Sequence, residues 1–249
     1  GHGAAAVGVV ALDYDETAEI VLQSEQLGTG HAVSQAKSAL AGCTGDVIIL
    51  YGDTPFVRPE TLQSLSAARK TADIVVLGFD AGDPVRYGRL VMQGAAVSRI
   101  VEYKDASEQE RAITFCNSGV ICAKAEVLFS LLEVVGNDNA SGEYYLTDIV
   151  QLANDRNLSV AAVHCDEAET MGINSRAELA QAEASFQTRT RAEMMALGVS
   201  LTAPETVYFA YDTVLGRDSQ IEPNVVFGPG VTVENSAHLR AFSHLEGCH

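Results

Sequence analysis

The stretch DVIILYGD, residues 46–53, decides the fold class. An unbroken apolar run that ends in Gly-Asp is typical of a strand buried on both faces of a largely parallel sheet. The next residues, 54–72, place Pro59 at a first helical position and carry an apolar helical stripe, and DIVVLGF at 73–79 has the pattern of another strand. Strand, helix and strand in this order predict a βαβ unit within an α/β domain.

The chain after residue 80 continues this mixture of strands and helices. Two short strands that meet at Gln93–Gly94 predict a hairpin, and two later apolar runs predict further strands. Two more helices are expected, the first capped by Ser141 and the second, long and polar, ending at Gly198. The expected ranges are 87–92 and 96–103 for the hairpin, 113–124 and 158–165 for the later strands, and 141–157 and 175–198 for the helices.

From residue 198 onward the pattern changes to a six-residue period. The residues that recur at this spacing are Leu215, Ile221, Phe227, Val233, Leu239 and Leu245. A period of six fits neither an α-helix nor an alternating strand, and it is typical of a parallel β-helix in which each repeat forms one side of a triangular coil. We therefore expect one domain at residues 1–197, ending in a linking helix at about 175–197, and the first coils of a β-helix at 198–249.

Charge and composition argue against several classes of protein. The 249 residues include 16 basic and 33 acidic ones, so the net charge is −17. Such a chain is poorly suited to bind nucleic acid or an anionic membrane, and a phosphorylated substrate would need a local cation or metal. No apolar run has the length of a membrane span, and we expect no signal peptide, because the first residues do not have the basic-then-apolar pattern of one. The five scattered cysteines form no C-x-x-C pair, which predicts reduced thiols and a cytoplasmic protein.

An ordered set of motifs carries a resemblance to a known family. The motifs are LQSEQLGTGHA (22–32), YGDTP (51–55), YGRL (87–90), IVEYKDA (100–106), NSG (117–119), GEYYLTDI (142–149) and GIN (172–174), with the hexapeptide period after them. Over nearly its whole length the chain resembles the bacterial bifunctional N-acetylglucosamine-1-phosphate uridylyltransferase and glucosamine-1-phosphate N-acetyltransferase. The resemblance implies a Rossmann-like nucleotide-diphospho-sugar transferase domain with a mixed, mostly parallel sheet, followed by a β-helix. Its left-handedness is implied by the resemblance alone.

The function that the resemblance implies is transfer of a uridylyl group. UTP and N-acetylglucosamine-1-phosphate would give UDP-N-acetylglucosamine, a precursor of peptidoglycan and lipopolysaccharide, and pyrophosphate, with Mg²⁺ as cofactor. A homotrimer through the β-helix is implied as well, and with about two coils we expect a weak one.

Two features of the family are missing from this sequence. Its L-x-A-G-x-G-T-R-M loop, with a lysine further on, would precede the motifs above, and its acetyl-transfer residues would follow residue 249. We therefore expect a piece cut at both ends, with most of the acetyltransferase half missing. Because the family's phosphate loop supplies basic side chains and backbone N–H groups, the piece alone is expected to lack appreciable transferase activity.

Two residues are predicted to be catalytic and to hold the metal. Asp53 directly follows a buried strand, where ligands bind in open α/β sheets. By resemblance Asp53 and Asn174 bind Mg²⁺, and a carboxylate with an amide oxygen suits a hard octahedral cation. Taken alone, Asp53 could equally be a turn or capping residue, and Asn174 would more often be one.

The other predicted contacts surround a nucleotide sugar. By resemblance the loop with Gln23, Gln26, Gly28 and Thr29 meets uracil, to which a glutamine amide offers both a donor and an acceptor. A glycine-rich turn that caps a helix is the alternative for this loop. The remaining substrate-binding residues implied are Tyr51, Gly52, Asp53, Gly88, Glu102, Asn117 and Asn174.

The residues leave simpler alternatives open. Tyr51 could be a core aromatic residue, and Glu102 could be a solvated strand residue beside Lys104. The chain could also be an inactive nucleotide-sugar-binding or assembly subunit of the same architecture, or a nucleotidyltransferase for another base or sugar.

Overall fold

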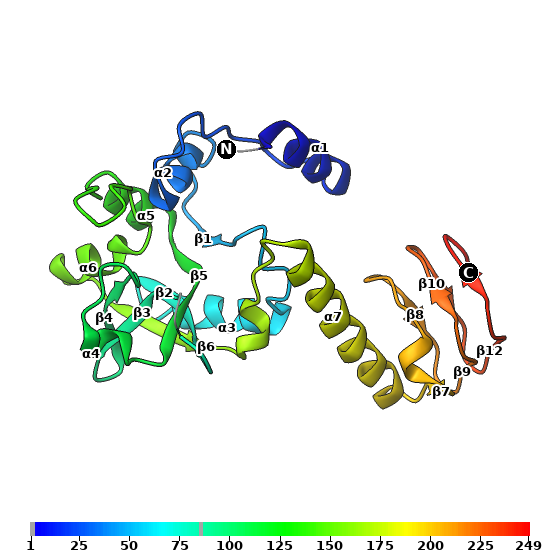
Figure 1. The fold of residues 1–249 in the computed structure, drawn as a ribbon. Coiled ribbons are helices and arrows are strands. Elements are labelled where there is room, and N and C mark those ends of the chain that lie inside the picture. The colour runs from blue at the N-terminus through cyan, green and yellow to red at the C-terminus, as the bar shows by residue number, and fades with distance from the viewer. Residues whose placement is uncertain (1–2, 85–86) are drawn as a thin grey trace. The chain divides into compact units, whose positions relative to one another are not determined.

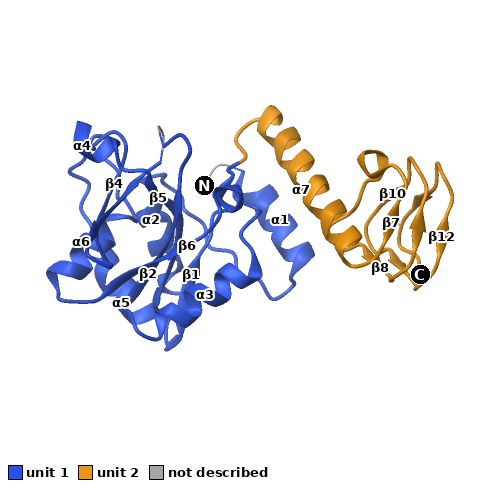
Figure 2. Cartoon of the chain, turned by 90° about the horizontal axis from the view of Figure 1, so that it is seen from below, with its two compact units in different colours: residues 1–172 blue, residues 173–249 orange. Residues whose placement is uncertain are grey.

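The computed structural model describes residues 3–84 and 87–249 of the chain. It divides into two compact units, residues 1–172 and residues 173–249 (Figure 2). The long helix predicted as a linker belongs to the second unit. The limits of the functional domains, predicted at 197 and 198, remain a prediction.

The first unit contains a six-stranded mixed sheet (Figure 1). Its strands are β1 (Asp46–Ile49), β2 (Ile74–Asp80), β3 (Arg89–Gln93), β4 (Ala96–Val101), β5 (Phe115–Lys124) and β6 (Val160–His164). They follow the order β4-β3-β5-β2-β6, and β1 also pairs with β5. The predicted hairpin is confirmed as β3 and β4, with Gly94 in the turn at a φ of 63°.

The predicted mixed sheet is confirmed, but its balance of parallel and antiparallel pairs differs from the prediction. Among the described pairings of this six-stranded sheet, only β2 with β6 is parallel. The reason is the position of β5. This strand lies between β1 and β2 and runs antiparallel to both, so the two strands of the predicted βαβ unit do not pair directly.

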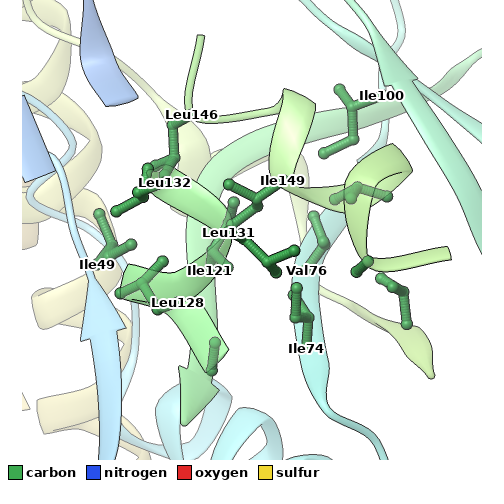
Figure 3. Close-up of a cluster of buried hydrophobic side chains, with 14 of the residues drawn as sticks. Ile49, Ile74, Val76, Ile100, Ile121, Leu128, Leu131, Leu132, Leu146 and Ile149 are labelled. Atoms are coloured by element: carbon green, nitrogen blue, oxygen red, sulfur yellow. The ribbon is translucent and has the colours of Figure 1, made fainter. Parts of the chain in front are cut away.

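Helices cover both faces of the sheet, with α5 (Ala125–Leu132) and α6 (Asp148–Asp155) on one face and α3 (Pro59–Arg69) on the other. The first unit also contains α1 (Ala4–Tyr14), α2 (Thr29–Ser34), α4 (Glu108–Arg111) and the short 3-10 turns η1 (Gln35–Lys37) and η2 (Glu167–Thr170). Along β2, Ile74 and Val76 pack in the cluster of α5 and α6 (Figure 3). Val75 and Leu77 pack in the cluster of α3. This alternation explains the unbroken apolar run of a strand that is buried on both faces.

One predicted helix begins later than expected. The helix predicted at 141–157 starts at Asp148, and Ser141 caps nothing. The residues before it form hydrogen bonds with the segment 27–30. The Gly30 amide donates to the Tyr144 carbonyl over 2.8 Å, the Tyr144 amide to the Leu27 carbonyl over 2.8 Å, and the Leu146 amide to Thr29 Oγ1 over 3.0 Å. Backbone groups used in this way cannot form the first turn of a helix.

The second unit begins with helix α7 (Arg176–Ala196), as predicted. The Ser175 side chain accepts a hydrogen bond from the Glu178 amide, and Gly198 follows the helix at a φ of 96°, which suits a left-handed C-terminal cap. After it come the short strand β7 (Ser200–Leu201) and the 3-10 turn η3 (Pro204–Thr206).

The remaining strands form a parallel β-helix. They are β8 (Val214–Leu215), β9 (Gln220–Ile221), β10 (Val226–Phe227), β11 (Thr232–Val233), β12 (His238–Leu239) and β13 (His244–Leu245). Each pairs in parallel with the strand one coil away, so that Leu215 lies beside Val233, Ile221 beside Leu239 and Phe227 beside Leu245. The predicted six-residue period thus places one inward apolar side chain on each side of the coil.

The corners of the coils also follow the period of six. The residues with a left-handed backbone there are Asp218, Asn224, Gly230, Ser236 and Phe242, with φ between 59° and 73°. Side chains join one coil to the next near these corners. Asp212 accepts from the Gly230 amide over 2.8 Å, and Glu222 accepts from Arg240 over 3.0 Å, in each case 18 residues further along.

A glutamine of α7 joins the helix to the first coil of the same unit. Gln187 is 3% exposed, and its amide group donates to the Phe209 carbonyl over 2.8 Å and accepts from the Phe209 amide over 2.9 Å. Its side chain therefore supplies the two hydrogen bonds that a neighbouring strand would make.

All five cysteines are free thiols.

Candidate functional site

The predicted sugar-side residues gather in a gap between two strands of the first unit. Strands β1 and β3 both pair with β5, with Ile49 opposite Ile121 and Arg89 opposite Cys116. Between these two positions β5 carries Asn117 and Gly119. The residues that follow β1 and those that precede β3 therefore meet at the same stretch of β5. A place where strands separate in this way is a common ligand site in α/β sheets.

Tyr51 occupies this gap beside β5. Its hydroxyl group lies near the Thr29 side chain, and burial raises the pKa of Tyr51, with the Glu102 charge as a further cause, although Thr29 lowers it. Gly119 has a φ of 88°, and a Cβ atom at this glycine would overlap the Tyr51 ring. The glycine of the NSG motif is thus required both by its backbone conformation and by the close approach of the ring.

Glu102 lies on the other side of the gap, after β4. Its carboxylate accepts a hydrogen bond from Thr147 Oγ1 over 3.1 Å. Burial raises the pKa of Glu102, although the Thr147 bond lowers it, and the charges of Asp148 and Asp105 raise it further. A carboxyl group that is half-buried, has an elevated pKa and lines two pockets of about 290 and 250 Å³ has the character of a functional residue.

Gly88 and Asn117 complete this part of the site. The Asn117 amide donates to the Gly88 carbonyl over 2.8 Å, and its side-chain oxygen accepts from the Gly119 amide over 3.1 Å. A Cβ atom on Gly88 would lie 3.4 Å from both carboxylate oxygens of Glu102. The structure therefore brings Gly88, Glu102 and Asn117 together, as a shared sugar contact requires.

The predicted base-binding loop lies next to Tyr51 through Thr29. Gln23 Nε2 donates to the Gly28 carbonyl over 3.1 Å and lies 3.1 Å from His31 Nδ1, so the loop is ordered by its own side chains. Gly28 has a φ of 110°, and Gln26 is exposed. The loop is a glycine-rich turn that begins a helix, because α2 starts at Thr29, and its predicted contact with a base remains a prediction.

Asp53 and Gly52 lie at the exposed edge of the same gap. The Asp53 charge contributes to the raised pKa of Tyr51, which places the two side chains near each other. In the part of the chain that the structure describes, the Asp53 carboxylate makes no hydrogen bond and no ion pair, and no group of three His, Cys, Asp or Glu side chains could hold a metal. An exposed, unused carboxylate fits a cation that takes its other ligands from elsewhere.

Asn174 belongs to the second compact unit. Its backbone amide donates to Glu178 over 2.7 Å at the start of α7. Its pairing with Asp53 remains a prediction.

Sequence reasoning missed two members of the site. Thr147 is 5% exposed and donates to Glu102, and Gly119 makes room for Tyr51. Both lie within motifs already noted, GEYYLTDI and NSG, which were the only signal available. Their partners lie far away in sequence, so the contacts themselves could not be inferred from spacing.

Comparison with known proteins decides the family. No family model matches the chain. The bifunctional protein GlmU of Ruegeria pomeroyi is 67% identical over all 249 residues, and that of Roseobacter denitrificans is 63% identical over the same range. This chain belongs to the GlmU family. It spans 55% of the length of these two GlmU proteins.

Solved structures confirm the fold of this GlmU family member. A UDP-glucose pyrophosphorylase in complex with UDP-glucose aligns with a TM-score of 0.51 at 12% identity, covering 67% of this chain and 64% of the other. A glucose-1-phosphate thymidylyltransferase from Bacillus anthracis aligns with a TM-score of 0.54 at 15% identity, covering 74% and 72%. Within the described ranges, none of the helices is long and apolar enough to cross a membrane.

The raised pKa of Glu102 leads to a first prediction, on stability. Because burial disfavours the charged carboxylate, Glu102 favours folding fully only below its unfolded pKa, and that contribution is lost as pH rises through the folded value. We expect Glu102→Gln to raise the melting temperature at pH 8 and to raise it less at pH 5. Thermal denaturation at both pH values measures this, with Glu143→Gln, an exposed residue, as the charge-matched control. An equal effect of Glu102→Gln at both pH values would contradict the prediction.

Proposed function

We propose that the chain carries the nucleotide-sugar site of a uridylyltransferase. In the proposed reaction a phosphate oxygen of N-acetylglucosamine-1-phosphate attacks the α-phosphorus of UTP, forming UDP-N-acetylglucosamine and releasing pyrophosphate. The observation that carries the proposal is the convergence of Thr29, Tyr51 and Glu102 on one gap in the sheet. These residues come from separate motifs, and membership in the GlmU family supports the same reading.

Each group has a proposed role in binding. The loop 23–29 is proposed to receive uracil, with the Gln23 and Gln26 amides and the Gly28 backbone as hydrogen-bonding groups. Glu102 accepts hydrogen bonds from sugar hydroxyl groups, and Thr147 holds its carboxylate in place. Tyr51 and Gly52 shape the pocket between base and sugar. Asn117 holds the backbone of Gly88 toward the sugar.

A divalent metal, Mg²⁺, is proposed to bind at Asp53 with Asn174. When bound, it would neutralise negative charge on the phosphate groups. The chain needs such a cation, because its net charge of −17 repels UTP and pyrophosphate. The Asp53 carboxylate would hold the cation, and the Tyr51 ring beside it would shield one side of the site from water. No covalent intermediate with the chain is required, so positioning of the two substrates would be the main contribution.

Assembly and location are proposed on the same basis. The β-helix is proposed to form the homotrimer contact, and the exposed apolar side chains of Tyr208, Val214 and Val226 on its strands and corners support this role. A cytoplasmic location follows from the proposed substrates and the free thiols.

Ligand choice tests the proposed function. We expect UDP-N-acetylglucosamine to bind at least about tenfold more tightly than ADP-N-acetylglucosamine, because a purine does not match the groups proposed to bind uracil, and each polar group that the bound base covers without pairing costs roughly 1–3 kcal/mol. Isothermal titration calorimetry of this chain with both ligands measures the ratio of the two affinities. Titration with a CDP-linked sugar tests whether the loop distinguishes uracil from cytosine. Equal affinity for uridine and adenosine ligands would remove the base-binding role of the loop. Selective binding without pyrophosphate release would favour a binding subunit.

A further inference from the structure

A buried carboxylate holds the loop that carries Asp53. Glu169, in the turn η2, is 3% exposed. Its Oε2 atom accepts a hydrogen bond from the Arg58 amide over 2.9 Å and another from Thr61 Oγ1 over 2.7 Å. Its Oε1 atom lies 4.0 Å from Nε of Arg58. A carboxylate so deeply buried is costly unless it is hydrogen-bonded, and the hydrogen bonds and the ion pair described for this carboxylate go to Arg58 and Thr61.

That segment is the junction between the Asp53 loop and helix α3. Arg58 is the residue before Pro59, the first residue of α3, and its own side chain makes no capping hydrogen bond. Glu169 therefore supplies the negative group that a helix N-terminus favours, from more than 100 residues further along the chain. The start of α3 is thus held by η2 and not by a side chain of the Asp53 loop.

The other end of the Asp53 loop is fixed as well. Thr54 donates from its amide over 3.3 Å and from its hydroxyl over 3.0 Å to the Tyr51 carbonyl. Asp53 lies inside this turn, five residues before Arg58, and its own side chain makes no hydrogen bond within the described residues. The Tyr51–Thr54 turn therefore holds the backbone at Asp53, and Glu169 fixes the end of the same loop at Arg58.

The turn η2 also ties down the loop after the neighbouring strand. Glu167 Oε2 accepts from the Gly82 amide over 3.2 Å, just after β2. Strands β1, β2 and β6 end at the same edge of the sheet, and η2 follows β6. Asn174, the other proposed metal ligand, lies five residues after Glu169 in the sequence.

From these contacts we infer that Glu169 is a positioning residue for the metal site. It acts through the Arg58 amide and Thr61 and holds the Asp53 carboxylate where a divalent cation can use it. The inference rests on the proposed function, because it takes Asp53 as a metal ligand. Residues one step behind a metal ligand commonly change metal affinity by about 10–100-fold when they are replaced.

The test measures binding of Mn²⁺ alone, followed by the electron paramagnetic resonance signal of free and bound Mn²⁺. We expect Glu169→Gln to weaken binding by about tenfold and to change the spectrum of the bound ion. The glutamine keeps the shape, and its carbonyl oxygen can take the place of Oε2, but the negative charge at the start of α3 is lost and an NH2 group takes the place of Oε1, facing Nε of Arg58. Glu167→Gln is the matched control, since it removes the same charge from the same turn and should leave the affinity unchanged.

Two more variants make the result decisive. Asp53→Asn removes the carboxylate proposed to hold the metal, and it should abolish the electron paramagnetic resonance signal of bound Mn²⁺. Thr61→Val removes one donor to Glu169 without changing any charge, and it should weaken binding a few-fold even if Glu169→Gln does not fold. Wild-type affinity and spectrum in Glu169→Gln and Thr61→Val, with loss in Asp53→Asn, would overturn the inference alone. Retention of binding in Asp53→Asn would overturn the proposed metal ligand, and the inference with it.

Discussion

Replacing Gly28 by alanine is expected to destabilise the first unit by about 3 kcal/mol or more. Gly28 has φ 110° and ψ 176°, a conformation open almost only to glycine, and forcing another residue into it costs about 1–3 kcal/mol. A Cβ atom there would also lie 2.7 Å from the Tyr144 carbonyl oxygen and 2.9 Å from its amide nitrogen. Such overpacking against backbone adds about 1–3 kcal/mol.

Hydrogen exchange measures this effect at the place where it arises. The Gly30 and Tyr144 amides, which pair the two segments, should lose protection in Gly28→Ala, and urea denaturation should give the change in stability. Gly42→Ala is the matched control, because Gly42 also has a positive φ, of 85°, but no atom lies within 4 Å of an added Cβ. Equal losses in the two variants would show that backbone strain alone, and not the contact with Tyr144, decides the result.

Replacing Ile221 by alanine is the second change with a large expected effect. Its side chain is fully buried in the cluster at the centre of the β-helix. Truncation of such a residue removes apolar contacts and leaves a cavity, which costs about 2–5 kcal/mol. We expect the amides of β9 and of its neighbours β7 and β12 to exchange much faster, because these strands pair only through short ladders.

The same position one coil further along provides the control. Leu239 lies opposite Ile221 in the parallel pair, but it is only half-buried. Leu239→Ala should therefore cost less than half as much in urea denaturation, since less apolar surface is removed from contact. A cost for Leu239→Ala as large as that for Ile221→Ala would contradict the assignment of the core to the earlier coil.

The features that the sequence predicted well are those encoded by a local pattern. The period from Leu215 to Leu245 repeats within a few residues, so each inward position of the β-helix could be assigned before any long-range contact was known. Helix α3 was predicted for the same kind of reason, since Pro59 marks its first residue and its apolar stripe is continuous. Such signals survive because nearby residues alone determine them.

The features that were missed depend on contacts between distant residues. The start of α6 at Asp148 depends on hydrogen bonds between Tyr144 and the loop near Gly28. The insertion of β5 between β1 and β2 depends on a pairing that no local period expresses. Within the site, the placement of Gly119 against Tyr51 and of Thr147 against Glu102 has the same origin. Residue types could be predicted there, but not their partners.

The left-handed corners of the β-helix have a consequence for insertions and deletions. Because these corners recur every six residues and coils pair 18 residues apart, the second unit has a reading frame, much as a coding sequence has. Loss of one residue between Asp218 and Asn224 would turn every later inward side chain outward and move Phe242 and Ser236 off their corners. Loss or gain of 18 residues would keep the frame and change only the number of coils. We expect length variation in this part of the fold to occur in whole coils, or at the corners, where an extra loop can leave without shifting the frame.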